Sequence, residues 1–88
     1  GRAYSFASVD RPNVVLETVK QAEDGDGVVL RLYECENGRT KTTLTVPTSF
    51  TKAYSTNLLE GIEEELPLKD GRATFTMMPF EIKTILLR

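Results

Sequence analysis

Hydrophobic side chains recur at every second position in five segments of the chain, which is the spacing of a β-strand that buries one face. The same segments are rich in β-branched and aromatic residues, which pack well on a pleated sheet. The pattern therefore predicts five strands, at Val14–Gln21, Val28–Glu34, Thr40–Val46, Arg72–Met77 and Ile82–Leu87.

Short glycine-containing sequences lie between these segments, at Glu23–Gly27, Glu36–Arg39 and Lys69–Arg72. Asn-Gly and Asp-Gly pairs supply the positive φ angles that tight hairpins require. Because the strands follow one another too closely for crossover helices, we expect antiparallel meanders. The predicted fold is all-β, an antiparallel two-sheet β-sandwich of the immunoglobulin-like kind with about seven strands.

The segment from Ser55 to Pro67 fits two structures. Asn57 could cap a short helix, with Glu60 reaching back to it as in a capping box. Gly61 weakens such a helix by about 1 kcal/mol. Leu58, Glu60 and Ile62 also alternate as a strand would, so the residues alone leave helix and strand equally open.

Composition narrows the classes of partner. The chain has 88 residues, 11 basic and 13 acidic, with a formal net charge of −2. A nucleic acid or an anionic membrane requires a basic footprint, so we expect neither as a partner. No apolar run approaches the ~20 residues that span a bilayer, and no signal-peptide pattern opens the chain. A chain of 88 residues is expected to form one domain, residues 1–88. Because the chain begins with Gly1, we expect this domain to be excised from a longer protein.

Cysteine and histidine counts narrow the chemistry. Cys35 is the single cysteine, which forbids an internal disulfide and favours a reducing compartment. We expect it to be a small, half-buried strand residue. The chain has no histidine, which removes Ser-His-Asp and Cys-His catalysis and the usual nitrogen ligands of zinc.

The sequence from Ala22 to Glu34 partly matches a calcium-binding loop, in which carboxylates at alternate positions precede a glycine. With Asp24, Asp26 and Gly27 at loop positions three, five and six, the first and twelfth ligand positions fall on Ala22 and Tyr33. Neither supplies a carboxylate, so we interpret this stretch as a solvated hairpin turn. We interpret the acidic run Glu63–Glu65 as a solvated face or turn, because its sequence neighbours supply no further hard ligands for a cation.

The sequence gives only weak support for a glycoside-hydrolysis site or for a sugar-binding platform. The carboxylates lie mostly in turns or beside Lys and Arg, and a pair without a cleft does not indicate glycoside hydrolysis. The chain has no Trp, so a sugar-binding platform would have to use Tyr4, Tyr33, Tyr54 or the four Phe residues. These aromatic side chains fit core or sheet packing better.

Several sequence elements together resemble the C-terminal β-sandwich segment of the α-mannosidases of glycoside hydrolase family 38. They are NVVLETVKQAEDGDGVVLRLYE, then TNLLE, then PFEIKTILL, in the order in which that family has them. The resemblance runs from about Ser5 to Leu87. It implies a β-sandwich and favours extended structure from Asn57 to Glu60.

Members of this family are zinc-dependent retaining exo-hydrolases of α-mannosides, with an Asp nucleophile and a His- and Asp-bound zinc in an upstream catalytic domain. None of those positions is matched here, so the resemblance implies no catalytic residue, no metal ligand and no cofactor in this fragment. It implies a cytoplasmic scaffold domain whose partners are the upstream domains. The alternative is an independent carbohydrate- or protein-binding module, and we expect at most weak glycan contact.

The closing segment predicts where those upstream domains would bind. Ile82–Leu87 has apolar residues on both faces, which suits an interior, well-paired strand entered through Pro79. We expect Phe80 to turn into the core and Glu81 to accept hydrogen bonds from backbone or from Arg31. The residues predicted to form an interdomain contact are Arg31, Tyr33, Glu34, Phe80 and Glu81.

Overall fold

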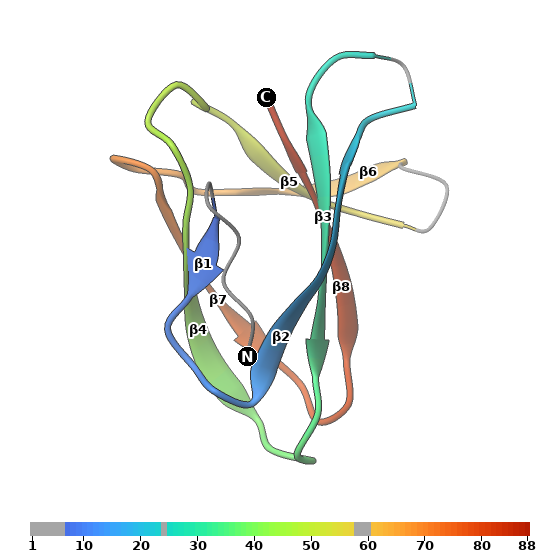
Figure 1. Cartoon of the computed structure of the whole chain (residues 1–88), viewed down its shortest axis with the longest axis vertical. Coiled ribbons are helices and arrows are strands. Elements are labelled where there is room, and N and C mark those ends of the chain that lie inside the picture. Colours follow the sequence, from blue (N-terminus) through green and yellow to red (C-terminus); the bar gives the residue numbers. More distant parts are fainter. Residues whose placement is uncertain (1–6, 24, 58–60) are drawn as a thin grey trace.

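The structure, a computed structural model, describes residues 7–23, 25–57 and 61–88. Within these ranges the chain forms eight strands and no helix (Figure 1). The strands are β1 (Ser8–Val9), β2 (Val14–Gln21), β3 (Val28–Glu34), β4 (Thr40–Thr45), β5 (Ala53–Thr56), β6 (Ile62–Leu66), β7 (Arg72–Met77) and β8 (Ile82–Leu87). All five predicted strands are present, and only the end of β4 differs, by one residue.

The strands form two antiparallel sheets, which confirms the predicted β-sandwich. One sheet has the order β1-β4-β7 and the other the order β2-β3-β8-β5-β6. The C-terminal strand β8 therefore pairs on one side with β3 and on the other with β5. This position confirms the prediction of an interior strand entered through Pro79.

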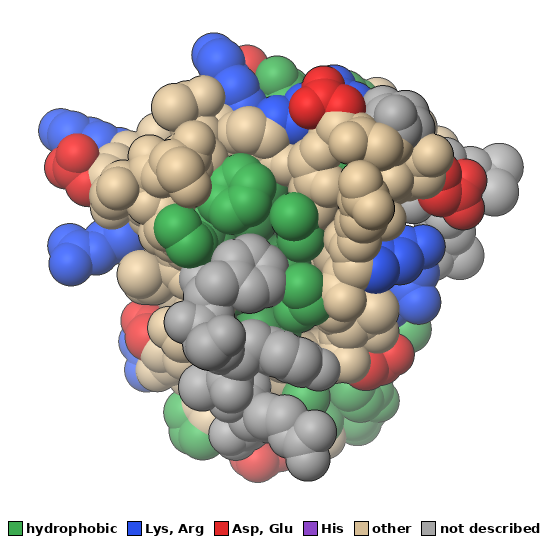
Figure 2. All heavy atoms as spheres, turned by 45° about the horizontal axis from the view of Figure 1, so that its top comes forward, with side chains coloured by type: hydrophobic (Ala, Val, Ile, Leu, Met, Phe, Trp, Pro, Cys, Tyr) green, Lys and Arg blue, Asp and Glu red, His purple; other side chains and the backbone are tan. Residues whose placement is uncertain are grey.

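The core lies between the two sheets, because alternate side chains of each sheet point toward the other. Leu44 and Met77 from the three-stranded sheet meet Leu30, Leu32 and Ile85 from the five-stranded one, and all five are fully buried. In the view of Figure 2, hydrophobic side chains form a group near the centre of the face, with charged side chains around its rim.

The prediction of antiparallel meanders is wrong for two of the three glycine turns. Only Glu23–Gly27 joins neighbouring strands, β2 and β3. Glu36–Arg39 and Lys69–Arg72 each cross from one sheet to the other, since β4 and β7 belong to the three-stranded sheet. Asn37 and Asp70 do have positive φ angles, 58° and 53°. A positive φ reverses the chain locally, but it does not choose the neighbouring strand, and β8 occupies the place beside β3.

The segment that fitted either helix or strand is partly resolved by the structure. Ile62–Leu66 is strand β6, so the helix interpretation is wrong there. Asn57 does not cap a helix in the described residues; its Oδ1 accepts a hydrogen bond from the Gly61 N–H, and its own N–H donates to the Gly61 carbonyl. The expected extended structure from Asn57 to Glu60 falls mainly on residues 58–60, outside the described residues.

Cys35 is exposed, and the expectation of a half-buried strand residue is wrong. Strand β3 ends at Glu34, one residue earlier, because the chain there turns toward the other sheet. The Cys35 N–H donates to the Asn13 carbonyl, which holds the backbone in place while the thiol points to solvent.

Candidate functional site

The Glu34 carboxylate, at the end of β3, accepts hydrogen bonds from three different parts of the chain. Alternation along β3 puts Glu34 on the same side as Leu30 and Leu32, so the carboxylate enters one end of the sandwich and is 0% exposed. Buried charge is costly unless it is hydrogen-bonded. Here Oε1 accepts from the Phe80 N–H at 2.8 Å, and Oε2 accepts from Asn13 Nδ2 at 2.7 Å and the Glu36 N–H at 2.9 Å.

These donors determine the protonation state of Glu34. Burial raises the pKa of its carboxyl, but hydrogen bonds from the Phe80 N–H, the Asn13 amide and the N–H groups of Glu36 and Gly38 outweigh burial and lower the pKa from 4.5 to about 2. A general acid needs a pKa near the working pH. Glu34 is therefore an acceptor that is ionised at neutral pH, with its oxygens occupied by the protein itself, and it is unsuited to acid catalysis.

The Glu34 network connects the two sheets. The Asn13 amide that donates to Glu34 also lies 2.7 Å from Thr40 Oγ1, and Thr40 begins β4 in the other sheet. The Thr40 hydroxyl in turn lies 2.8 Å from the Gly38 carbonyl oxygen. One buried carboxylate thus holds together the start of β2, the end of β3 and the start of β4.

The turn between β7 and β8 is built on the same carboxylate. The prediction that Phe80 enters the core is wrong: its side chain is 52% exposed, and its φ is +57°. The backbone N–H of Phe80 is the part directed inward, to Glu34, so the ring remains outside. A left-handed φ in a bulky residue costs free energy, which the bond to the buried carboxylate offsets.

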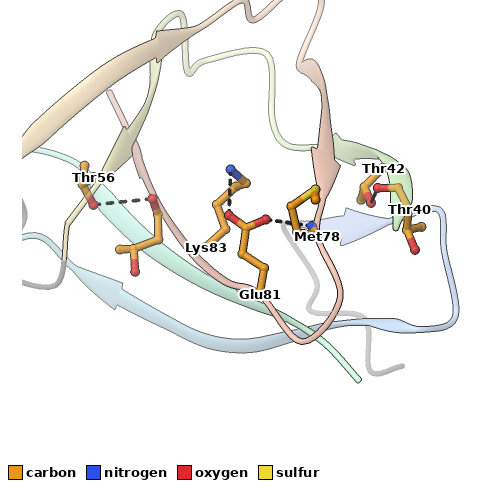
Figure 3. Close-up of polar contacts among 7 residues, drawn as sticks. Thr40, Thr42, Thr56, Met78, Glu81 and Lys83 are labelled. Carbon is orange, nitrogen blue, oxygen red and sulfur yellow. Dashed lines mark hydrogen bonds and ion pairs between the residues drawn. The ribbon is translucent and has the colours of Figure 1, made fainter. Parts of the chain in front are cut away.

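Glu81 completes this turn (Figure 3). Its Oε1 accepts from the Met78 N–H at 2.8 Å, and its Oε2 lies 3.4 Å from Lys83 Nζ. The Lys83 ammonium also lies 5.6 Å from the centre of the Phe75 ring. The prediction that Glu81 accepts from backbone is confirmed. The alternative partner, Arg31, is wrong, because Arg31 points to the opposite side of the sheet.

The structure places the five predicted contact residues in three environments. Glu34 is internal, and Phe80 and Glu81 form the turn above it. Arg31 and Tyr33 lie on the outer side of the five-stranded sheet, where Tyr33 pairs with Ile82. Their predicted role in an interdomain contact stays a prediction.

Sequence reasoning missed Asn13 and Phe80 as partners of Glu34, and Thr40 as the partner of Asn13. Asn13 is 21 residues from Glu34 and Phe80 is 46, so no local spacing pairs them. One signal was present in the sequence: Glu34 falls on the same, inward-facing side of the strand as Leu30 and Leu32. A carboxylate at such a position requires hydrogen-bond donors from elsewhere in the fold.

The residues that the structure describes do not fit a zinc site. Histidine is absent from the sequence. In ranges 7–23, 25–57 and 61–88, no group of three His, Cys, Asp or Glu side chains is arranged to hold a metal ion. In the turn that partly matched a calcium loop, Asp26 Oδ2 lies 3.5 Å from Arg88 Nε, and Asp24 falls outside the described residues.

None of the described segments is a helix long and apolar enough to cross a bilayer.

Residues 13–85 match the model of the family described as glycosyl hydrolases family 38 C-terminal beta sandwich domain. The chain is 38% identical over 90 residues to Alpha-mannosidase 2C1 of Homo sapiens, which covers 97% of this chain and 9% of that protein. It is 32% identical over 83 residues to Alpha-mannosidase G of Dictyostelium discoideum, covering 91% of this chain and 8% of that protein. The chain thus spans less than a tenth of the length of these relatives. It belongs to the family of C-terminal β-sandwich domains of the family 38 glycosyl hydrolases.

Proposed function

We propose that this chain is a non-catalytic scaffold domain of a longer, zinc-dependent retaining α-mannosidase that acts on α-mannosides in the cytoplasm. The observation that carries the proposal is the Glu34 network: this buried carboxylate has its oxygens occupied by internal donors and a pKa lowered to about 2. Such a group stabilises the fold and offers nothing to a substrate. We propose that zinc is held elsewhere in the longer protein.

Two further observations support this role. The relatives named above are α-mannosidases of which the matched segment covers only 8–9%. The Glu34 network also fixes the β7–β8 turn with the Phe80 ring outward, as a rigid, apolar feature of the surface. A rigid accessory domain can support a catalytic domain without contributing to its chemistry.

The test compares the isolated chain with the longer protein. The isolated chain should neither hydrolyse aryl α-mannosides nor bind zinc in a calorimetric titration. Removing this domain from the longer protein should lower its melting temperature and its soluble yield. Turnover by the isolated chain that a chelator abolishes would contradict the proposal, as would a deletion without effect on the longer protein.

A glycan titration addresses the alternative of an independent binding module. Saturable binding of mannosides to the isolated chain at millimolar or lower concentration would favour that alternative. We expect none, because the chain contains no Trp for a flat sugar-binding platform.

A further inference from the structure

The outer faces of the two sheets differ in character. Solvent-facing sides of antiparallel sheets are normally polar. The outer face of the three-stranded sheet follows this rule, since Thr43 pairs with Thr74 and their hydroxyls lie 3.1 Å apart. Its outward residues on β4 and β7 are all polar: Lys41, Thr43, Thr45, Arg72, Thr74 and Thr76.

The outer face of the five-stranded sheet carries more apolar side chains: seven of the thirteen paired outward positions that the structure describes are apolar, and the other six are Thr18, Lys20, Arg31, Thr56, Glu65 and Thr84. The register of β2, β3, β8, β5 and β6 gives its outward positions. We call the following residues the apolar face: Val15, Val29, Tyr33, Tyr54, Ile62, Ile82 and Leu86.

Part of the apolar face is already covered by the domain itself, and part is open. Val29 and Leu86 are buried in a small second cluster with Ala22, against which Tyr54 packs. Ile82 on β8 and Ile62 on β6, in contrast, are 55% and 51% exposed. Both lie on one sheet face, whereas the two other exposed large hydrophobic residues of the described chain, Met78 and Phe80, lie in the β7–β8 turn. Two exposed isoleucines on the same face as a buried apolar cluster fit an interaction surface.

Arg31 lies in the middle of this face. It pairs with Thr84 of β8 on one side and Thr18 of β2 on the other. Its Nε is buried and has no hydrogen-bond partner in the described part of the chain. A buried donor without an acceptor is costly. The Nε is closed to a second surface, but Arg31 as a whole is only half-buried, so a partner meets the accessible part of this residue. A carboxylate is the acceptor that matches a guanidinium best, because it accepts two parallel N–H bonds.

We infer that the apolar face docks onto the remainder of a longer α-mannosidase chain, through an apolar surface that carries one carboxylate for Arg31. The inference rests on the proposed function. The length of chain that would lie outside this domain supports the choice of occupant, since the matched segment covers only 8–9% of its relatives.

The size of the face is sufficient for such an interface. Five strands about 4.8 Å apart and six residues at ~3.4 Å each give a face on the order of 20 by 20 Å, roughly 400 Å². Interfaces between domains of one chain bury about 600–1,500 Å² in total, or roughly 300–750 Å² on each side. The whole outer face of the sheet thus lies in the lower part of that range, and the area around Val29 and Leu86 is already buried within the domain.

The test uses the full-length protein with charge-introducing variants on each face. Ile82→Glu and Arg31→Glu should each lower its melting temperature and shorten the half-life of its α-mannosidase activity. Thr74→Glu, an exposed position on the polar face of the other sheet, should change neither. If all three variants behave alike, the docking face is wrong.

Hydroxyl-radical footprinting of the wild-type full-length protein gives a second readout that needs no variant. In the domain alone, Ile62 and Ile82 are about half exposed. Docking is supported if these two residues are labelled in the folded protein to well below half of the extent reached in the urea-unfolded protein. Labelling near half would overturn it. Protection that disappears on dilution would assign the face to a second copy of the chain and also overturn it.

Failure of the docking inference can be distinguished from failure of the proposed function. If deleting the domain destabilises the longer protein while Ile82→Glu and Arg31→Glu match Thr74→Glu, the scaffold function stands and the face is wrong. If the deletion has no effect, the proposed function itself fails.

Discussion

Two isoleucines of β8 allow a matched test of which side of the strand is buried. Ile85 points between the sheets and is 0% exposed, whereas Ile82, three residues earlier on the same strand, is 55% exposed. We predict that Ile85→Ala destabilises the isolated chain strongly and that Ile82→Ala does so weakly. The residue type and the strand are the same, so the difference reports burial alone.

The magnitude follows from the two exposures. Fully burying an isoleucine side chain is worth about 1.5–3 kcal/mol, and the cavity left by truncation raises the cost of Ile85→Ala to about 2–5 kcal/mol. Less than half of the Ile82 side chain is covered, so Ile82→Ala should cost about 1 kcal/mol or less. Typical domains are stable by only about 5–15 kcal/mol, so the first substitution removes a large part of the total.

Urea and thermal unfolding of the isolated chain measure both variants. A domain of this size loses roughly 4–8 °C in melting temperature per kcal/mol, so a cost of about 2–5 kcal/mol for Ile85→Ala should lower the midpoint by about 8–40 °C. The dependence of unfolding free energy on urea should stay unchanged in both variants. Equal destabilisation by the two substitutions would refute the assignment of the inner and outer sides of β8.

Three further predictions concern the turns, the network and the terminal strand. The pKa of Glu34 is lowered from 4.5 to about 2, so its contribution to the free energy of unfolding is present above about pH 4.5 and is lost as pH falls toward 2. In Glu34→Gln, the free energy of unfolding should therefore change less with pH across that interval. Denaturant titrations at successive pH values measure this difference. Gly71 has a φ of +77°, and a Cβ there would overlap the Val46 carbonyl oxygen. Gly25 has a similar φ but open space around it. Gly71→Ala should therefore lower the melting temperature much more than Gly25→Ala does. Removing residues 82–88 deletes the strand between β3 and β5, and the shortened chain should show no cooperative melting transition; a transition near the midpoint of the intact chain would mean that β8 is peripheral.

Much of the fold could be predicted from the sequence because local patterns determine it. Alternation at period two is a property of a single strand, and the five predicted strands lie where the structure has them, to within one residue at the end of β4. The positive φ angles at Asn37 and Asp70 are likewise local, because these residue types tolerate the left-handed region. The two-residue strand β1 was not predicted, since two residues contain no period.

Pairing between distant segments was decided only by the tertiary structure. Two glycine turns lead to strands in the opposite sheet, and β8 takes the place beside β3 that a meander would have given to β4. The bonds of Glu34 depend on this arrangement, since Asn13 and Phe80 come near it only when β2 and β8 flank β3. The outward position of Phe80 follows from the same bonds, because its N–H, rather than its ring, satisfies the buried carboxylate. Sequence spacing encodes which side of a strand a residue occupies, whereas the partner that it meets there depends on which strands become neighbours.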